Sequence, residues 1–486
     1  MKYLGFILLF FIAQPIFSFQ YNASTPTIRD PFSLLEAYGE DHPHLPESLK
    51  NLAKREYSLA LKNLNLETSA QYSWFKNYLE GLIVVSEPLI RFDSAHFTLY
   101  VPKGAEFLKE YALPMLEDMG NYVEKNFQHR PKRKIIVEIY PDSDHFSIAS
   151  TLSPQILENS GAIGICKFHR LMIMSPQALP LGYRWMDALA HEYMHLIINE
   201  LSGSRAELWI HEGTARYFET AYRLNPPTFL SPDQKTKLIE AKEKGTLVPF
   251  KKMSPSMVYL KDQDEVSLAF GQVSHAVCQL VEKKGASSYG RFLRGLKSGL
   301  FETEFKKHFE DSPEEFEILW KEKLGGEKWE KSVGAMSDKV IFGAFEEENL
   351  LGASAQGMVR LGDRMRQRGL HEAALIEYEK ALNIEPDNAI LLLKAARSLL
   401  AQGNKEKAIT YLRWAIKKNP NYGTPYIELA PLVGDSDAID FLKEANSINP
   451  FNPQIHKLLS EAYERVGESK KSIFELTIFE SLMSQK

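Results

Sequence analysis

The sequence is poor in cysteine, with only Cys166 and Cys278 among 486 residues. Two thiols cannot build the network of cross-links that stabilises small secreted domains. The core of this protein must therefore hold without a disulfide framework. The sequence leaves open whether the two residues pair, and two isolated buried thiols are the preferred interpretation.

An excess of positive charge is also missing. The chain has 58 Lys and Arg residues against 63 Asp and Glu residues, a net charge of −5 and a pI near 6.3. Proteins that bind nucleic acid usually present a basic face. We therefore expect no nucleic-acid partner.

Long apolar runs are absent as well, since no stretch reaches the roughly 18 apolar residues that a spanning helix needs. A shorter apolar run at 3–13 follows Lys2, is closed by Pro15, and precedes a small residue, Ser18. This layout is typical of a secretory signal peptide, predicted at 1–18. A buried first helix and an uncleaved anchor are the alternatives. The mature protein is expected to be extracytoplasmic, periplasmic or secreted, without a stable membrane span.

What remains is long enough for two or three domains, and its 44% hydrophobic and 25% charged residues are ordinary for folded proteins. Apolar spacing predicts an N-terminal helical segment over 19–90. An α+β domain follows over 91–325, and 326–354 reads as a linker. The strands expected in the α+β domain lie at 94–102, 133–141 and 161–176, the last as a strand pair or long edge strand.

The C-terminal part repeats itself. Gly369 recurs as Gly403 and Pro386 as Pro420, both 34 residues apart. Small residues at the helix contacts and proline at the unit end resemble tetratricopeptide repeats, whose helix–turn–helix unit has this length. The resemblance covers 355–486 as three units plus a capping helix. It implies an all-α solenoid that binds a protein partner, whereas an unrelated helical bundle would not keep the register.

The segment "HEYMH" begins at His191 in the middle of the chain. His191 and His195 are four residues apart, so on a helix their imidazoles leave the same face one turn apart. That spacing suits two corners of a zinc tetrahedron. Glu192 between them is placed to take a proton from a water beside the metal. The apolar flanks argue against a solvated surface helix.

A second apolar helix follows once "SGSR" (202–205) breaks the first. It carries Glu212, seventeen residues after His195. A catalytic zinc has three protein ligands and one open position, and a returning glutamate completes that set. Zinc is therefore the expected cofactor.

The two helices together resemble the peptidase MA clan, the gluzincin-type zinc metallopeptidases, and in particular its peptidase MA-like domains. The matching residues are the His-Glu-x-x-His helix and the residues of a Trp-x-x-Glu-Gly-x-Ala helix: His191, Glu192, His195, Trp209, Glu212, Gly213 and Ala215. The resemblance reaches from about Phe97 to Leu324. It implies an α+β zincin-like fold, zinc held by the two histidines and Glu212, Glu192 as general base, and a peptide or protein substrate.

Other polar residues near the motif have weaker assignments. Glu219 and Asp187 are candidates for orienting the ligand histidines through the second ring nitrogen, with solvated or capping carboxylates as the alternative. His211 is interpreted as incidental, because a direct neighbour of Glu212 points elsewhere on the helix.

One departure from the family concerns the downstream helix. Family members often carry a tyrosine there that steadies the oxyanion, whereas this chain has Phe270. Tyr259 or His275 could substitute. The resemblance thus leaves two readings, an exported zinc metallopeptidase with partner-binding repeats, or a catalytically inactive peptidase-like scaffold whose repeats mediate protein–protein interaction.

Overall fold

A five-stranded mixed sheet forms the centre of the first half of the chain in this computed structural model. The structure describes residues 44–66, 72–227, 230–253, 257, 260–337, 339–343 and 350–484, so the predicted signal peptide lies outside the described residues. The strands are β1 (Ile90–Asp93), β2 (Phe97–Val101), β3 (Ile135–Tyr140), β4 (Gly164–Lys167) and β5 (Arg170–Met174). Their order is β1-β2-β3-β5-β4, with β2, β3 and β5 parallel and both edge strands antiparallel.

The three strand regions expected from the sequence are confirmed as β2, β3 and the hairpin β4–β5. Their interior positions are almost wholly apolar, which is what strands covered on both faces require. The sequence does not predict β1, a four-residue strand in which only alternate side chains are half-buried. Such a short edge strand has too little apolar patterning to stand out.

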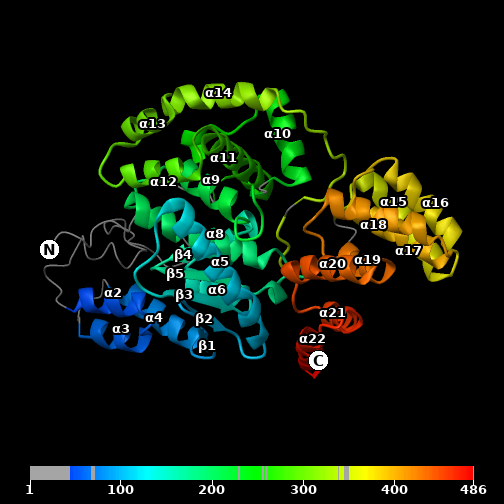
Figure 1. The fold of residues 1–486 in the computed structure, drawn as a ribbon, viewed down its shortest axis with the longest axis horizontal. Coiled ribbons are helices and arrows are strands. Elements are labelled where there is room, and N and C mark those ends of the chain that lie inside the picture. The colour runs from blue at the N-terminus through cyan, green and yellow to red at the C-terminus, as the bar shows by residue number, and fades with distance from the viewer. Residues whose placement is uncertain are drawn as a thin grey trace. The chain divides into compact units, whose positions relative to one another are not determined.

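The described residues form two compact units, and the sheet belongs to the first, made of the described residues within 44–175, 186–227 and 247–326. Figure 1 shows the cyan strands between the blue helices α2, α3 and α4 and the green helices α9, α11 and α12. The helices of this unit are α2 (Leu45–Ala53), α3 (Tyr57–Leu64), α4 (Ser73–Ser86), α5 (Lys109–Phe127), α6 (Ser143–Ser150), α7 (Pro154–Ser160), α8 (Trp185–Ser202), α9 (Leu208–Phe218), α11 (Gln263–Lys284), α12 (Ala286–Gly295), α13 (Phe301–Phe309) and α14 (Pro313–Gly325).

A buried ion pair joins the N-terminal helices to the sheet. Glu138 on β3 and Arg170 on β5 are both fully buried, with 2.9 Å between the Arg170 Nη1 and the Glu138 Oε2 atoms. Arg55, between α2 and α3, donates from Nε to the other carboxylate oxygen at 2.6 Å. Buried charges are tolerated only when paired in this way. The helical segment predicted at 19–90 is therefore bound to the sheet where it is described.

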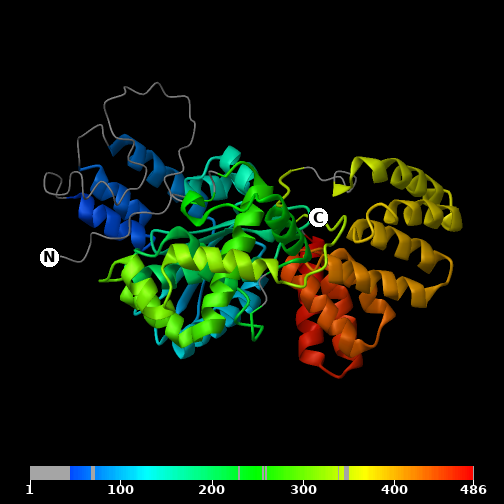
Figure 2. The same ribbon diagram turned by 90° about the horizontal axis from the view of Figure 1, so that it is seen from above.

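Four helical hairpins make up most of the second unit. They are α15 (Ala353–Gln367) with α16 (His371–Leu382), α17 (Ala389–Ala401) with α18 (Lys405–Lys418), α19 (Thr424–Leu429) with α20 (Asp435–Ile448), and α21 (Pro453–Arg465) with α22 (Ser469–Ser484). Figures 1 and 2 show them side by side in chain order, from yellow to red. Gly369, Gly403 and Gly467 turn three of the hairpins with φ of 77°, 79° and 80°, a conformation that favours glycine.

The sequence correctly predicts an all-α repeat region, while the expected three units plus a capping helix are four helix pairs. Gly369 and Gly403 occupy the same turn position in two successive hairpins, which explains why they are 34 residues apart. The third hairpin departs from the 34-residue spacing because its first helix, α19, has only six residues.

The second unit also contains two segments from earlier in the chain, Pro176–Trp185 and Leu230–Thr246, besides Glu327–Lys486. Helix α10 (Pro232–Lys244) lies in one of them. It binds the region expected as a linker, because Thr236 Oγ1 accepts a hydrogen bond from the Ser332 amide at 2.9 Å. These boundaries differ from those expected at 91–325 and 326–354. Hydrogen bonds between segments a hundred residues apart leave no local pattern in a sequence. Among the described residues, no helix is long and apolar enough to cross a bilayer.

Candidate metal centre

Two helices, α8 and α9, carry the metal-ligand candidates and meet through a sharp reversal. Gly203 and Ser204 follow α8 with φ of 63° and 60°, and consecutive left-handed residues end a helix and redirect the chain. The helix break that "SGSR" predicts at this point is confirmed.

The tryptophan and glycine of the second motif helix have packing roles. The Trp209 ring stacks on Phe250, with ring centroids 4.6 Å apart, and its Nε1 donates to Glu207 at 3.0 Å. At Gly213, a Cβ would lie 2.5 Å from the Val273 carbonyl oxygen of α11. Trp209 and Gly213 therefore fix α9 against its neighbours and so hold Glu212 in place.

The three predicted ligands bring their donor atoms together. The His191 and His195 Nε2 atoms are 3.0 Å apart, and Glu212 Oε2 lies 3.8 Å from the first and 3.5 Å from the second. Zinc bonds of about 2.0–2.1 Å place the ligand atoms of a tetrahedron about 3.3 Å apart. The three donors have the spacing of one face of such a tetrahedron.

The charges around these donors also fit a cation. Glu192, Glu212 and Glu219 are all buried, and Arg216, paired with Glu219, is the guanidinium that balances one of them. Buried carboxylates are tolerated only with such partners, and His191 contacts both Glu212 and Glu219. Two imidazole nitrogens and one carboxylate oxygen are ligands that zinc takes in proteins, so the residues present fit zinc.

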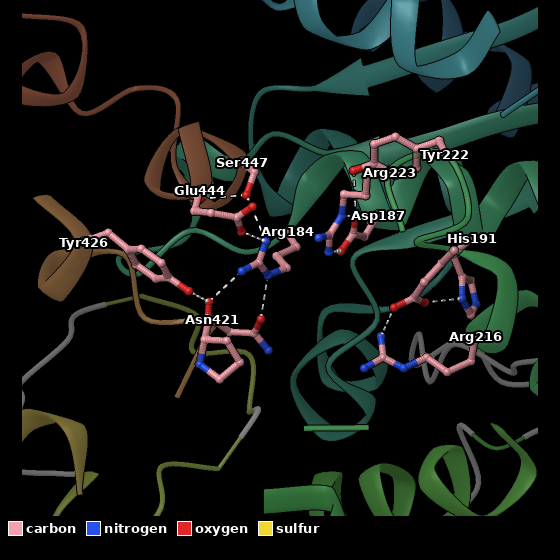
Figure 3. Close-up of polar contacts among 12 residues, drawn as sticks. Arg184, Asp187, His191, Arg216, Tyr222, Arg223, Asn421, Tyr426, Glu444 and Ser447 are labelled. Carbon is pink, nitrogen blue, oxygen red and sulfur yellow. Dashed lines mark hydrogen bonds and ion pairs between the residues drawn. The ribbon is translucent and has the colours of Figure 1, made fainter. Parts of the chain in front are cut away.

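His191 is oriented through its second nitrogen. Its Nδ1 lies 3.1 Å from Glu219 Oε2, and the same carboxylate pairs with Arg216. Figure 3 shows the side chains of His191 and Arg216 close to one another. Burial opposes protonation, but hydrogen bonds to Glu212 and Glu219 raise the pKa of His191 to about 10. With this pKa the metal-free ring carries a proton on each nitrogen at neutral pH. A metal would take the place of the proton on Nε2, while Glu219 would keep the proton on Nδ1. Of the two carboxylates proposed from the sequence for this role, Glu219 contacts His191.

His195 is oriented by His211, which the sequence interpretation treats as incidental. The two rings stack with centroids 4.5 Å apart, and their Nδ1 atoms are 2.8 Å apart. His211 Nε2 donates to the Asn199 side-chain oxygen at 3.1 Å, and burial lowers the pKa of His211 to about 4. A neutral His211 with its proton on Nε2 must accept at Nδ1. His195 therefore donates from Nδ1, and its Nε2 lone pair faces His191.

Asn199 sits one helical turn after His195, as i and i+4 on α8. The i, i+4 spacing of His195 and Asn199 is the one sign in the sequence of the contact between His195 and His211. It is easily missed, because Asn199 contacts His211 and does not contact His195 directly. Asp187, the other proposed orienting residue, instead accepts hydrogen bonds from Tyr222 at 2.7 Å and from Arg223.

Glu192 stands beside the donors against the edge strand β4. Burial raises the pKa of Glu192 to about 8, and the nearby Glu212 acts in the same direction, whereas His191 lowers this pKa. Gly164 on β4 is the residue that gives it room, since a Cβ there would lie 2.6 Å from Glu192 Oε1. Sequence reasoning misses Gly164, because a close approach between a strand and a distant helix has no local signature.

The downstream helix α11 presents Phe270 to the site. Its ring centroid lies 6.1 Å from that of His191, in an edge-to-face arrangement. His275 is buried and accepts a hydrogen bond from Trp320 Nε1 at 3.1 Å, and Tyr259 lies outside the described residues. Cys166 and Cys278 are free thiols. An apolar ring thus occupies the neighbourhood where the family resemblance led us to look for a hydroxyl donor.

Comparison with known proteins bears on the C-terminal helices. No family model matches the chain. The small glutamine-rich tetratricopeptide repeat-containing protein of Dictyostelium discoideum is 36% identical over 77 residues, which are 16% of this chain and 23% of that protein. The match thus spans about a quarter of the relative. The C-terminal helical hairpins are similar to tetratricopeptide repeats.

Solved structures with low TM-scores were also found. MamA is 20% identical, with 27% of this chain and 79% of that chain covered and a TM-score of 0.26. A thermophilic TPR protein of Thermus thermophilus is 24% identical, with 26% and 74% covered and a TM-score of 0.24. Likeness at this level says nothing about function. None of these relatives bears on the α8–α9 region.

The orienting role of His211 predicts a change in zinc affinity. In His211→Ala, His195 loses the acceptor behind its ring, and zinc should bind about ten- to a hundredfold more weakly. Competition with a coloured chelator measures this affinity. His145→Ala, which removes a histidine that pairs with Asp142 away from the donors, is the control and should stay near the wild type. Unchanged zinc affinity in His211→Ala would restore the view that His211 is incidental.

The close approach at β4 predicts a selective loss of turnover. In Gly164→Ala, the new methyl group would displace the flexible Glu192 carboxylate while leaving the three donors in place. We expect zinc content to be unchanged and peptide hydrolysis to fall at least about tenfold, because misplacing a catalytic group by an ångström is costly. Gly357→Ala is the control, since nothing lies within 4 Å of its added Cβ. Equal activity in both variants would contradict the placement of Glu192.

Proposed function

We propose that this protein is a zinc-dependent metallopeptidase that carries a protein-binding repeat scaffold. The observation that supports it is the convergence of His191 Nε2, His195 Nε2 and Glu212 Oε2 to mutual distances of 3.0–3.8 Å. Two donors on α8 and one on α9 leave a fourth tetrahedral position open, which is the arrangement of catalytic rather than structural zinc.

The residues around the donors have different roles in the proposed reaction. Zinc at this position would supply a Lewis acid that polarises a peptide carbonyl and makes a water more acidic. Glu192 takes a proton from the attacking water and returns it to the leaving amine. Glu219 and His211 keep the two imidazoles turned so that Nε2 faces the open position.

The repeats supply a surface for a protein partner. An open groove of about 390 Å³ runs along α17, α19 and α21. Its lining mixes apolar and polar side chains, as expected for a peptide-binding surface. The residues are Leu400, Thr424, Ile427, Glu428, Pro431, Leu432, Asn452, Gln454 and Leu458. With the signal-peptide pattern at 1–18, we propose that both activities operate outside the cytoplasm.

A scaffold without turnover is the second candidate, and the comparisons favour it because they relate the chain to repeat proteins alone. One feature of the site also favours it, the apolar Phe270 ring 6.1 Å from the His191 ring. Loss of a single oxyanion donor is worth roughly 3 kcal/mol of barrier. Such a loss would slow hydrolysis strongly without affecting metal binding.

Metal analysis combined with a cleavage assay separates these candidates. The purified mature protein is expected to contain about one zinc per chain by elemental analysis and to cleave members of a peptide library. Zinc without cleavage of any peptide would favour the scaffold. Absence of zinc after refolding with excess metal would contradict the metal centre itself.

A further inference from the structure

Strand β4 is the last strand in the order of the sheet, and its outer side lies against the proposed general base. Figure 1 shows β4 beside β5, the strand with which it pairs. A Cβ added to Gly164 would lie 2.6 Å from Glu192 Oε1. Burial raises the pKa of Glu192 to about 8, and a backbone hydrogen bond from Cys166 is among the contacts that lower this pKa. The Glu192 carboxylate thus contacts two alternate residues of one short strand.

Hydrogen bonds to β5 leave the backbone of alternate β4 residues facing the outer side. The Met174 amide donates to the Ile163 carbonyl at 2.9 Å, at the end of the hairpin away from its turn. In an antiparallel ladder such pairs recur at every second residue. Gly164 and Cys166 therefore turn their N–H and C=O groups away from β5, which agrees with the contact between Cys166 and Glu192.

The register of this hairpin decides which residue of β4 lies against Glu192. Because side chains alternate along a strand, a slip of one residue would exchange the two faces of β4. Ile163 or Ile165 would then take the place of Gly164. An isoleucine does not fit where even one added carbon would lie 2.6 Å from the carboxylate, so Glu192 would be displaced. The position of Glu192 therefore depends on the register of β4.

The turn that sets this register contains residues that such a turn does not favour. Lys167 pairs directly with Arg170, so the turn consists of Phe168 and His169, with φ of 53° and 58°. Hairpin turns with two left-handed residues strongly favour Asn-Gly, because bulky residues rarely adopt positive φ. Contacts with the rest of the first unit must therefore hold the turn in this conformation.

The side chain of Phe168 supplies such a contact. It is only 3% exposed, and its ring centroid lies 5.9 Å from that of Tyr78 on α4. Tyr78 is itself fixed, since its hydroxyl donates to the Ala149 carbonyl of α6 at 2.9 Å. Next to Phe168, Lys167 Nζ donates to Thr151 Oγ1 at 2.7 Å, just beyond α6. A turn of another length would pull the Phe168 ring out of this packing and lose the free energy of its burial.

We infer that Phe168 is a positioning residue for Glu192. Its buried ring holds the two-residue turn, the turn fixes the register of β4, and the register places Gly164 rather than an isoleucine beside the carboxylate. All of these contacts join residues of the first unit. The inference rests on the proposed function for the role of Glu192 in hydrolysis, whereas the register can be measured without metal or substrate.

The test uses the full-length protein with Phe168→Ala. Zinc affinity, measured by chelator competition, should stay within about twofold of the wild type, because the three donors lie on α8 and α9. Peptide hydrolysis should fall at least about tenfold, since the general base is then misplaced. In the metal-free protein, the amides of Ile165 and Lys167, which the observed register bonds to β5, should exchange at least about tenfold faster.

A second variant separates the register from packing. Phe168→Asn combined with His169→Gly provides the residues that this turn prefers, while the ring is still missing. If Phe168 acts through the register, the double variant should recover amide protection and hydrolysis to within about threefold of the wild type. Phe309→Ala is the matched control, since Phe309 is 1% exposed and packs on Phe292 of α12, with ring centroids 4.9 Å apart. It should destabilise the protein without a selective change at β4.

The outcomes separate this inference from the proposed function. Wild-type hydrolysis and wild-type exchange of β4 in Phe168→Ala overturn it, because the turn then holds without the ring. A double variant that is no better than Phe168→Ala, or that also fails to fold, overturns it too, because the ring then contributes packing alone. Faster exchange spread evenly over the chain, as in Phe309→Ala, reports general destabilisation and has the same consequence.

An unfolded Phe168→Ala beside a folded double variant with protected β4 amides supports the inference, since turn residues then replace the ring. A wild type that binds no zinc or cleaves no peptide defeats the proposed function instead. The exchange pattern of the metal-free variants still decides whether Phe168 sets the register of β4.

Discussion

Glu192→Gln is expected to keep its zinc and its fold while losing about a hundredfold to ten-thousandfold in the rate of peptide hydrolysis. The amide is almost the same size as the carboxylate, so the close packing against Gly164 is preserved. It cannot accept a proton from the attacking water. Hydrolysis of a peptide library and zinc content are measured on the same preparations of wild type and variant.

Glu200→Gln is the matched control for this change, because Glu200 lies on the same helix but pairs with His129 at 2.7 Å instead of facing the donors. It should retain wild-type activity. Equal residual activity in the wild type and Glu192→Gln would indicate a contaminating protease and support the scaffold reading. If the wild type binds zinc and cleaves nothing, Phe270→Tyr tests whether a missing hydroxyl is the reason.

The convergence of the three candidate donors could be predicted from the sequence because its geometry is local. His191 and His195 are related by one helical turn, and a helix delivers that relation without help from distant parts of the chain. Glu212 required only that the helix break at 202–205 and a second helix return. The repeats were predictable for a similar reason, since each hairpin has the same helix–turn–helix pattern at a nearly constant spacing.

The orienting contacts and the unit boundary could not be predicted in this way. His211 reaches His195 because two helices cross at one particular distance, and Gly164 meets Glu192 across a strand and a helix. Arg184 finds its partners more than 230 residues further along the chain. These contacts depend on tertiary packing, and the residues involved are ordinary surface types when read one at a time. A period or a motif carries no information about them.

Zinc is expected to be lost from His195→Ala. A catalytic zinc has three protein ligands, and removing one also leaves His211 facing a void where its stacking partner stood. We expect affinity to fall by at least about a thousandfold, well beyond the ten- to hundredfold effect of losing a hydrogen-bond partner of a ligand. Elemental analysis after dialysis gives stoichiometry, and chelator competition gives affinity.

Stability supplies an independent measure of the same loss. Zinc that binds only the folded protein stabilises it by about 2.7 kcal/mol when its free concentration is a hundred times the Kd. The thermal midpoint of the wild type should therefore rise with added zinc, whereas that of His195→Ala should not respond over the same range. His129→Ala, a histidine variant outside the donor cluster, should respond like the wild type. Stoichiometric zinc in His195→Ala would contradict the site, and stoichiometric zinc in Glu212→Ala would remove Glu212 alone from the ligand set.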